Sequence, residues 1–139
     1  MQMNPYLSFG GDCEEAFKFY EECLDGKLGE IFRYAGTPVS EHVPADWQNK
    51  VMHGSMTIGE QVLMGADIAP DRYEKPQGFS LSLQIKSAMQ AERIFQLLAK
   101  DGTVVLPLQE VWAAGFGMLV DRFGIPWMVN CVAGLWRPA

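Results

Sequence analysis

The chain has 139 residues, of which 48% are hydrophobic and 12% aromatic, a composition typical of one folded globular domain. Its formal charge of -6, from 11 basic and 17 acidic residues without a basic cluster, excludes nucleic acid as the expected partner. No apolar run is long enough to span a membrane, and the N-terminus lacks the pattern of a signal peptide. We therefore expect a cytoplasmic protein that binds neither nucleic acid nor membrane. The three cysteines form no even set and no Cys-x-x-Cys pair, so we expect reduced, buried thiols at Cys13, Cys23 and Cys131.

The first 67 residues predict a strand, a helix and three further strands. The helix is expected to start after Asp12, which forms a capping-box pattern with Glu15, and to end at Asp25-Gly26, where glycine supplies a left-handed C-cap. Residues 36–50 carry glycine, proline and polar groups and predict a long loop. The expected elements are the strand Asn4–Phe9, the helix Cys13–Leu24, and the strands Leu28–Tyr34, Val51–Ile58 and Gln61–Gly65.

A linker over residues 67–77 separates this pattern from a second one of the same kind. Ser87 is the expected N-cap of a helix that runs to about Lys100 and is ended by Asp101-Gly102. Its apolar stripe is expected at Met89, Ile94, Phe95, Leu97 and Leu98. The expected strands are Phe79–Ile85, Thr103–Leu108, Phe116–Asp121 and Ile125–Val132, the last two joined by a turn at Phe123-Gly124.

The two halves read as a repeat. Their helix-ending Asp-Gly pairs lie 76 positions apart. Gly26 and Gly59 are separated by 33 positions, whereas Gly102 and Gly124 are separated by 22, so the first half is longer by 11 residues, which fall in the loop 36–50. We predict a single α+β domain over residues 1–139, built from two tandem βαβββ modules (3–67 and 78–132) that form a curved mixed sheet with a central cleft.

Each half opens with a strand whose two faces differ. Apolar residues alternate with a polar row, which must face either water or a hydrated cavity. If the sheets curl toward each other, these rows line a cleft; in the alternative reading they face bulk solvent. The rows consist of Asn4, Tyr6 and Ser8 in the first half and Ser80, Ser82 and Gln84 in the second.

Six segments occur in a fixed order along the chain: Asn4-Pro-Tyr-Leu-Ser-Phe9, Ala16-Phe-Lys-Phe-Tyr20, Val51-Met-His53, Val62-Leu-Met-Gly-Ala-Asp67, Gly117-Met-Leu-Val-Asp-Arg-Phe-Gly124 and Trp127-Met-Val-Asn130. This ordered set resembles the vicinal oxygen chelate superfamily, which includes glyoxalases, extradiol dioxygenases and bleomycin-resistance proteins. It is most similar to the PhnB-like branch, also labelled 3-demethylubiquinone-9 3-methyltransferase-like. The sequence has no Gly-rich strand-to-helix loop suited to a nucleotide-like methyl donor, so we set methyl transfer aside.

The resemblance implies a homodimer and, in the enzymes of the superfamily, metal ligands on the first and last strands of each half. The matching positions here lie near Pro5 or Tyr6, near Leu63 or Met64, and at about Ser80 and Met128. None offers the imidazole or carboxylate that a divalent metal prefers. We therefore expect no bound metal and no cofactor.

His53 is the candidate catalytic residue, because an imidazole titrates near neutrality and can act as a general base or as an orienting donor. It shares a predicted polar row with Ser55 and Thr57, opposite Met52, Met56 and Ile58; the alternative is a hydrogen-bonded structural histidine. Trp47, Trp112 and Phe116 offer flat surfaces for an apolar or aromatic ligand, although such side chains also fill cores. Trp127 is expected in the core, and Asp67 and Asp121 are expected to cap or turn the chain.

These observations favour a small-molecule-binding protein without a catalytic metal, whose ligand is apolar or aromatic. One alternative is a metal-dependent lyase, isomerase or dioxygenase of the same superfamily. A second is an interaction module, which the polar rows disfavour because the core of a protein interface is depleted of such groups. The candidate ligand-binding residues are Tyr6, Ser8, His53, Ser80, Ser82, Trp112, Met128 and Asn130.

Overall fold

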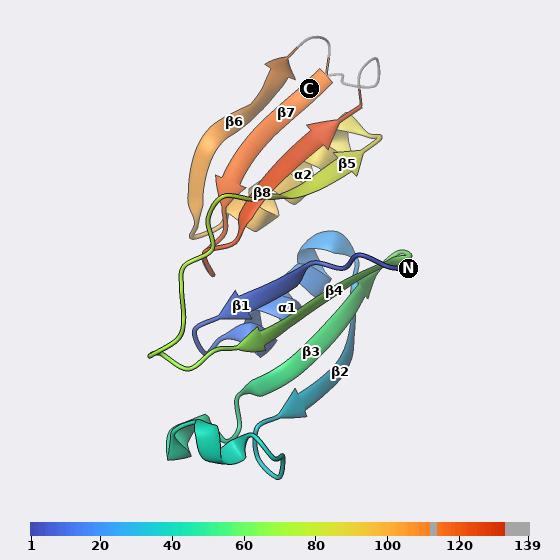
Figure 1. Cartoon of the computed structure of the whole chain (residues 1–139). Helices are drawn as coiled ribbons and strands as arrows, with labels where there is room; N and C mark the ends of the chain where they lie inside the picture. Colours follow the sequence, from blue (N-terminus) through green and yellow to red (C-terminus); the bar gives the residue numbers. More distant parts are fainter. Residues whose placement is uncertain (112–113, 133–139) are drawn as a thin grey trace. The chain divides into compact units, whose positions relative to one another are not determined.

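A computed structural model describes residues 1–111 and 114–132 of the chain (Figure 1). The chain divides into two compact units, Met1–Glu74 and Lys75–Ala139. Each unit holds one four-stranded mixed sheet with one helix against one of its faces, which confirms the predicted α+β class (Figure 1). Neither helix in the described part of the chain has the length and hydropathy needed to cross a bilayer.

The sheet of the first unit has the strand order β1-β4-β3-β2, in which β1 runs parallel to β4 and the other neighbours are antiparallel. Its elements are β1 (Tyr6–Phe9), α1 (Cys13–Leu24), β2 (Lys27–Arg33), β3 (Val51–Ile58) and β4 (Gln61–Asp67), with the short 3-10 helices η1 (Ser40–His42) and η2 (Ala45–Trp47) between β2 and β3.

The sheet of the second unit repeats this arrangement with the order β5-β8-β7-β6 and a parallel pair between β5 and β8. The repeated order of elements and the repeated sheet order confirm two tandem βαβββ modules. The elements are β5 (Leu81–Ile85), α2 (Ala88–Ala99), β6 (Thr103–Val111), β7 (Ala114–Val120) and β8 (Pro126–Cys131).

Several predicted strand boundaries were wrong, and three of them change which residues belong to the sheets. β4 continues to Asp67, so this residue belongs to the sheet rather than to the linker. β5 begins at Leu81, so Phe79 and Ser80 precede the strand, and Phe79 is exposed instead of adding to the apolar face. β6 extends to Val111 because it continues to pair with β7 along its whole length.

The two helices bury faces of different composition. In α1 the buried face follows the predicted spacing, and Ala16, Phe17 and Tyr20 are fully buried. In α2 the predicted stripe was partly wrong, because Met89 and Leu97 are exposed. At about 100° of rotation per residue, these two positions point away from the side that meets the sheet. The buried face of α2 consists of Ala88, Ala91, Ile94, Phe95 and Leu98.

Both helices end in a left-handed residue, but that residue is aspartate and not the predicted glycine. Asp25 has a φ of 52° and Asp101 has a φ of 59°. The glycine that follows is needed for a different reason, the close approach of another segment, which is β3 in the first unit and the end of β7 in the second. A Cβ on Gly26 would lie 2.9 Å from the carbonyl oxygen of Thr57, and one on Gly102 would meet the backbone of Val120 and Asp121.

The loop between β2 and β3 has a small core of its own. The buried side chains of Tyr34, Val43, Trp47 and Ala69 form this loop cluster, and Met52 packs against it. Packing therefore accounts for Trp47, which is buried and does not offer a free surface to a ligand. The thiols of Cys13, Cys23 and Cys131 are buried, as predicted, and none of the three is part of a disulfide.

Candidate functional site

The face of the first sheet opposite α1 carries most of the candidate residues of this unit. Strand alternation turns Leu7 and Phe9 toward the helix, where they are buried, and leaves Tyr6 and Ser8 on the other side. Residues paired across neighbouring strands share a face, so the registers of the sheet define the remaining members. We call this surface the first open face: Tyr6, Ser8, Phe32, His53, Ser55 and Met64.

A bulge in β3 decides which residues reach this face. Phe32 pairs with His53, whereas the next residue of β2, Arg33, pairs with Val51, so Met52 is the extra residue. The bulge lets Val51 face the core while His53 and Ser55 stay on the open face. The predicted polar row of His53, Ser55 and Thr57 is confirmed, but the expected position of Met52 in the sheet core is wrong, because it packs on the loop cluster.

Tyr6 and His53 form a hydrogen-bonded pair on the first open face. The Tyr6 hydroxyl lies 3.0 Å from Nδ1 of His53, and the two ring centroids are 5.6 Å apart. Phe32 lies on β2, the neighbouring strand, with its ring centroid 6.4 Å from that of His53 and its plane inclined by 26°. The imidazole thus lies between two aromatic rings that are each about half exposed, Tyr6 at 50% and Phe32 at 48%.

The protonation states of this pair determine what it presents to a ligand. Partial burial, followed by the influence of Cys13 and Tyr34, raises the pKa of Tyr6, so the phenol stays protonated at neutral pH. When Tyr6 donates its hydrogen to Nδ1, the neutral imidazole carries its own hydrogen on Nε2. When the imidazole is charged, Nδ1 donates instead and the Tyr6 hydroxyl hydrogen becomes available. In either of these states the face offers a hydrogen-bond donor next to flat aromatic rings.

The second sheet has a corresponding surface, which we call the second open face: Ser82, Gln84, Phe116, Met118, Met128 and Asn130. The Asn130 amide nitrogen donates to Oγ of Ser82 at 3.0 Å and to the carbonyl oxygen of Leu83 at 3.1 Å. The Gln84 amide nitrogen donates to the same Ser82 oxygen at 3.0 Å. These bonds fix both amides, so that their oxygens can accept hydrogen bonds from a ligand, beside the thioether of Met128.

The sequence-predicted candidates fall into three groups. Tyr6 and His53 touch each other, and Ser8 shares their face at a half-buried position. Ser82, Met128 and Asn130 lie together in the second unit, and Ser80 is half-buried just before β5. Trp112 lies outside the described residues. Phe32 was missed, since its place beside His53 depends on a strand register that the sequence does not reveal.

The positions that the superfamily uses for metal ligands do not fit a divalent cation in either unit. Tyr6 and Met64 are register partners across β1 and β4, and they offer a phenol and a thioether. Met128 is the register partner of Ser82 across β8 and β5. Within residues 1–111 and 114–132, no three His, Cys, Asp or Glu side chains gather in a way that can hold a metal ion. We therefore derive no chemical step through a metal.

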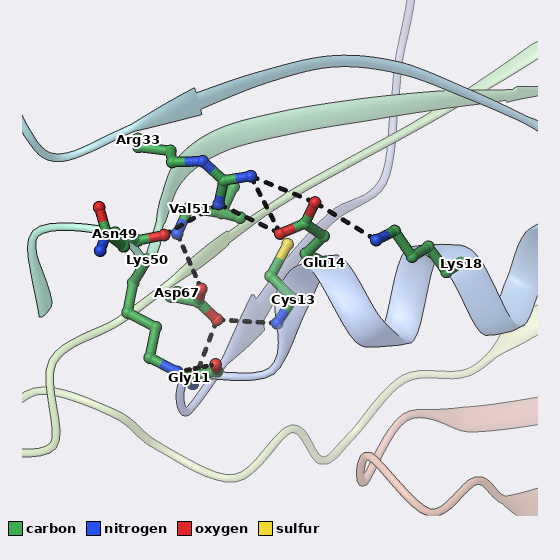
Figure 2. A network of polar contacts seen from close by, with 9 residues as sticks. All are labelled: Gly11, Cys13, Glu14, Lys18, Arg33, Asn49, Lys50, Val51 and Asp67. Carbon is green, nitrogen blue, oxygen red and sulfur yellow. Dashed lines mark hydrogen bonds and ion pairs between the residues drawn. The ribbon is translucent and has the colours of Figure 1, made fainter.

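The N-terminus of α1 is already occupied by the protein's own carboxylate (Figure 2). One oxygen of Asp67 accepts from the backbone N–H of Gly11 at 3.1 Å and of Cys13 at 2.9 Å, and the other accepts from Val51 N–H at 2.9 Å. The predicted capping box is wrong, because Asp12 sits at the N-cap without a side-chain cap bond. A phosphate or sulfonium-bearing cofactor thus finds no free strand-to-helix cradle at Gly10-Gly11.

Charged side chains close the same corner of the unit (Figure 2). The Lys50 ammonium donates to the carbonyl oxygen of Gly11 at 2.8 Å. Arg33 pairs with Glu14 at 3.1 Å and also donates to the carbonyl oxygen of Asn49 at 2.9 Å. The network joins the start of α1 to the start of β3, and we assign it to folding rather than to ligand binding.

Comparison with known structures first defines the fold. A glyoxylase/bleomycin resistance protein/dioxygenase domain from Frankia sp. EAN1pec shares the fold, with a TM-score of 0.62 at 14% identity over 94% of each chain. Protein PA1353 from Pseudomonas aeruginosa is more similar, with a TM-score of 0.85 and 44% identity over 96% of this chain and 98% of that one. The PhnB protein from Bacillus cereus has a TM-score of 0.81 at 24% identity, over 95% and 100% of the two chains.

The family follows from the sequence comparisons. A family model described as 3-demethylubiquinone-9 3-methyltransferase matches residues 1–130. Protein YjdN from Escherichia coli (strain K12) is 33% identical over 141 residues, which cover 95% of this chain and 96% of that protein. The chain therefore belongs to the 3-demethylubiquinone-9 3-methyltransferase family, as its motifs indicate, and it shares the fold of the glyoxylase/bleomycin resistance protein/dioxygenase domain.

Proposed function

We propose that the protein binds an apolar or aromatic small molecule through the open faces of its two sheets, without a resident catalytic metal. The observation that carries the proposal is the Tyr6–His53 hydrogen bond on a half-exposed surface beside Phe32. A flat apolar surface with one fixed polar donor is what recognition of an aromatic molecule with a single oxygen acceptor requires.

The second open face supports the same function with different chemistry. Gln84 and Asn130 hold their amide groups through Ser82, and Phe116 and Met128 supply apolar surface next to them. A face that combines oriented amides with a thioether and a ring suits a ligand with both polar and apolar edges. A central cleft shared by the two halves, expected from the sequence, stays a prediction. We also propose that the protein is cytoplasmic and homodimeric; light scattering that gives a monomer mass contradicts the dimer.

Histidine NMR tests ligand binding at the first open face directly. The chain has two histidines, His42 in η1 and His53 in β3, so their two Cε1–H resonances report two separate places. During titration with aromatic alcohols such as 2-naphthol, we expect the His53 resonance to move and to saturate while the His42 resonance stays in place. His42→Gln and His53→Gln assign the two signals.

Two tyrosine variants provide the matched comparison. Tyr6→Phe removes the hydroxyl that bonds His53 and should weaken binding of 2-naphthol by about three- to ten-fold, the value of one hydrogen bond. Tyr73→Phe removes the hydroxyl of a residue whose ring packs on Gly10 and that is not a member of the first open face, and it should leave binding unchanged. Equal affinities of the two variants would contradict the proposal. Trp112→Phe tests the remaining sequence candidate by loss of the ligand-induced change in tryptophan fluorescence.

The metal-dependent alternative makes a separate prediction. Elemental analysis of the purified protein should find less than stoichiometric zinc, iron, nickel and manganese. A stoichiometric metal whose removal abolishes turnover of a substrate with vicinal oxygens would replace our proposal by the lyase, isomerase or dioxygenase function.

A further inference from the structure

The first unit contains a pocket that has no part in either open face. It lies between the loop that follows β2 and the turn that follows β4, and its cavity volume is about 360 Å³. This volume is within the range of small-molecule sites in proteins. The pocket belongs to the longer loop of the first half, so the second half has no counterpart in sequence.

The wall of the pocket is almost entirely apolar. Tyr34 and Val43 of the loop cluster form its buried part, and Val39, Met52 and Ile68 line the rest. The Tyr34 hydroxyl does not face a ligand as a free donor, because it donates to the carbonyl oxygen of Asp67 at 2.6 Å. The pocket therefore offers an apolar wall and no polar group from its interior.

Two basic side chains, Arg72 and His42, complete the lining. Both residues are exposed, and in the described part of the chain the Arg72 guanidinium forms no salt bridge, in contrast to Arg33, which pairs with Glu14. The acidic neighbours in sequence, Glu41 and Asp71, are exposed and do not line the pocket. A positive group at the edge of an apolar pocket, in a chain with a net charge of -6, selects for an anion with an apolar body.

Hydrogen bonds hold both sides of the pocket in place. The backbone N–H groups of Arg72 and Tyr73 donate to the carbonyl oxygen of Ala69 at 2.9 and 3.0 Å, which fixes the turn that carries Arg72. On the loop side, the Gln48 amide donates to the carbonyl oxygen of Ser40 at 2.9 Å. A preformed pocket loses little conformational entropy when a ligand enters it.

We infer that this pocket binds a small amphipathic carboxylate, with the apolar body against Val39, Val43 and Met52 and the carboxylate at Arg72 and His42. A guanidinium matches the two oxygens of a carboxylate in a planar, bidentate geometry. The site is separate from the proposed aromatic site on the first open face, and neither depends on the other.

Titration with octanoate, followed by the same two histidine resonances, tests the inference. We expect octanoate to move the His42 resonance and to leave the His53 resonance in place, the reverse of the pattern expected for 2-naphthol. Acetate lacks the apolar body and 1-octanol lacks the charge, so each should bind at least about ten-fold more weakly than octanoate.

Three variants separate the pocket from general charge effects. Arg72→Gln should weaken octanoate binding by about ten-fold and leave 1-octanol unchanged. Lys27→Gln removes one exposed positive charge at the other end of β2 and should have no effect. Val39→Asp puts a negative charge on the exposed part of the wall and should abolish octanoate binding. Equal affinity for octanoate and 1-octanol, no effect of Arg72→Gln, a shift of His53 instead of His42, or no saturation at millimolar octanoate would each overturn the inference.

Discussion

The two units share a topology, and each has a buried aspartate that accepts hydrogen bonds. The sequence separation between this aspartate and its donors differs between the units. Asp67 is 1% exposed and accepts three backbone hydrogen bonds, from Gly11, Cys13 and Val51. Asp121 is 3% exposed and also accepts three, from Phe123 and Ile125 N–H and from the indole of Trp127. The donors to Asp67 lie 16 to 56 residues away, and those to Asp121 lie 2 to 6 residues away.

This difference shows that the same fold can be stabilised either by long-range or by local hydrogen bonds to a buried carboxylate. In the first unit a single carboxylate joins the last strand to the start of α1 and to the start of β3. In the second unit the carboxylate orders the turn between β7 and β8 and anchors Trp127, while Ser87 caps α2 locally by accepting from Gln90 N–H at 3.2 Å. Four predictions test this difference between the two units.

The largest effect is expected from the aspartates themselves. Asp67→Asn should lower the free energy of unfolding by about 3 kcal/mol and Asp121→Asn by about 2 kcal/mol, because an amide NH2 turns one acceptor into a donor that faces buried N–H groups. The Asp67 variant should lose more because its three donors belong to different elements and cannot relax together. Urea denaturation measures both values, and a larger loss for Asp121→Asn would contradict the distinction.

The glycines after the two helices test how closely the units correspond. Gly26→Ala and Gly102→Ala should each cost about 1 to 3 kcal/mol, because the new methyl group overlaps β3 in the first unit and the end of β7 in the second. Gly102→Ala should cost more, since its nearest atoms all belong to the backbone, whereas Gly26 also faces the mobile end of Met56. Thermal unfolding shows which of the two variants loses more stability. Melting temperatures equal to that of the wild type would contradict the close contact between these glycines and the neighbouring backbone.

The helix caps should give a smaller difference. Ser87→Ala removes the side-chain acceptor at the start of α2 and should cost about 1 kcal/mol. Asp12→Ala removes no cap bond, because Asp67 takes that role, and should cost less than half as much. Parallel urea titrations provide the measurement. A loss for Asp12→Ala as large as that for Ser87→Ala would restore the capping box that the sequence predicted.

The smallest effect concerns pH. Partial burial, together with Asp67 and Glu15, raises the pKa of Asp12 above its ordinary value of 3.8, although the Asp12 backbone and Lys50 act in the other direction. The folded state therefore holds this proton more tightly than the unfolded state, and ionisation of Asp12 reduces stability as the pH rises through this range. Asp12→Asn should be slightly more stable than the wild type at neutral pH, and this gain should vanish well below pH 3.8. A gain that persists in acid would exclude this explanation.

Local signals in the sequence were sufficient for the order of elements. The amphipathic spacing and flanking turns gave the bounds of α1 correctly, and Ser87 caps α2 as expected. The Asp-Gly pairs marked both helix ends, although the residue with positive φ is the aspartate. These features depend on neighbouring residues and on the chemistry of a single turn, which a sequence displays directly.

Features that depend on contacts between distant residues were not accessible in this way. The bulge at Met52 places Val51 rather than Met52 opposite Arg33, and the separate register shift between Leu28 and Ile31 brings Phe32 beside His53. The acceptor for the N-terminus of α1 lies 54 residues from Cys13, so Asp12 was the natural but incorrect choice. The exposure of Met89 and Leu97 likewise follows from the side of α2 that the sheet covers.

The bulge also lets side chains of β3 pack against two different cores of the first unit. Met56 contributes to the core under α1, while Met52 belongs to the loop cluster with Tyr34 and Trp47. The longer connection between β2 and β3 is therefore part of the packed structure of the first unit. Shortening it to the length found in the second half would remove the residues that cover Tyr34 and Met52, so the first unit depends on this loop for part of its packing.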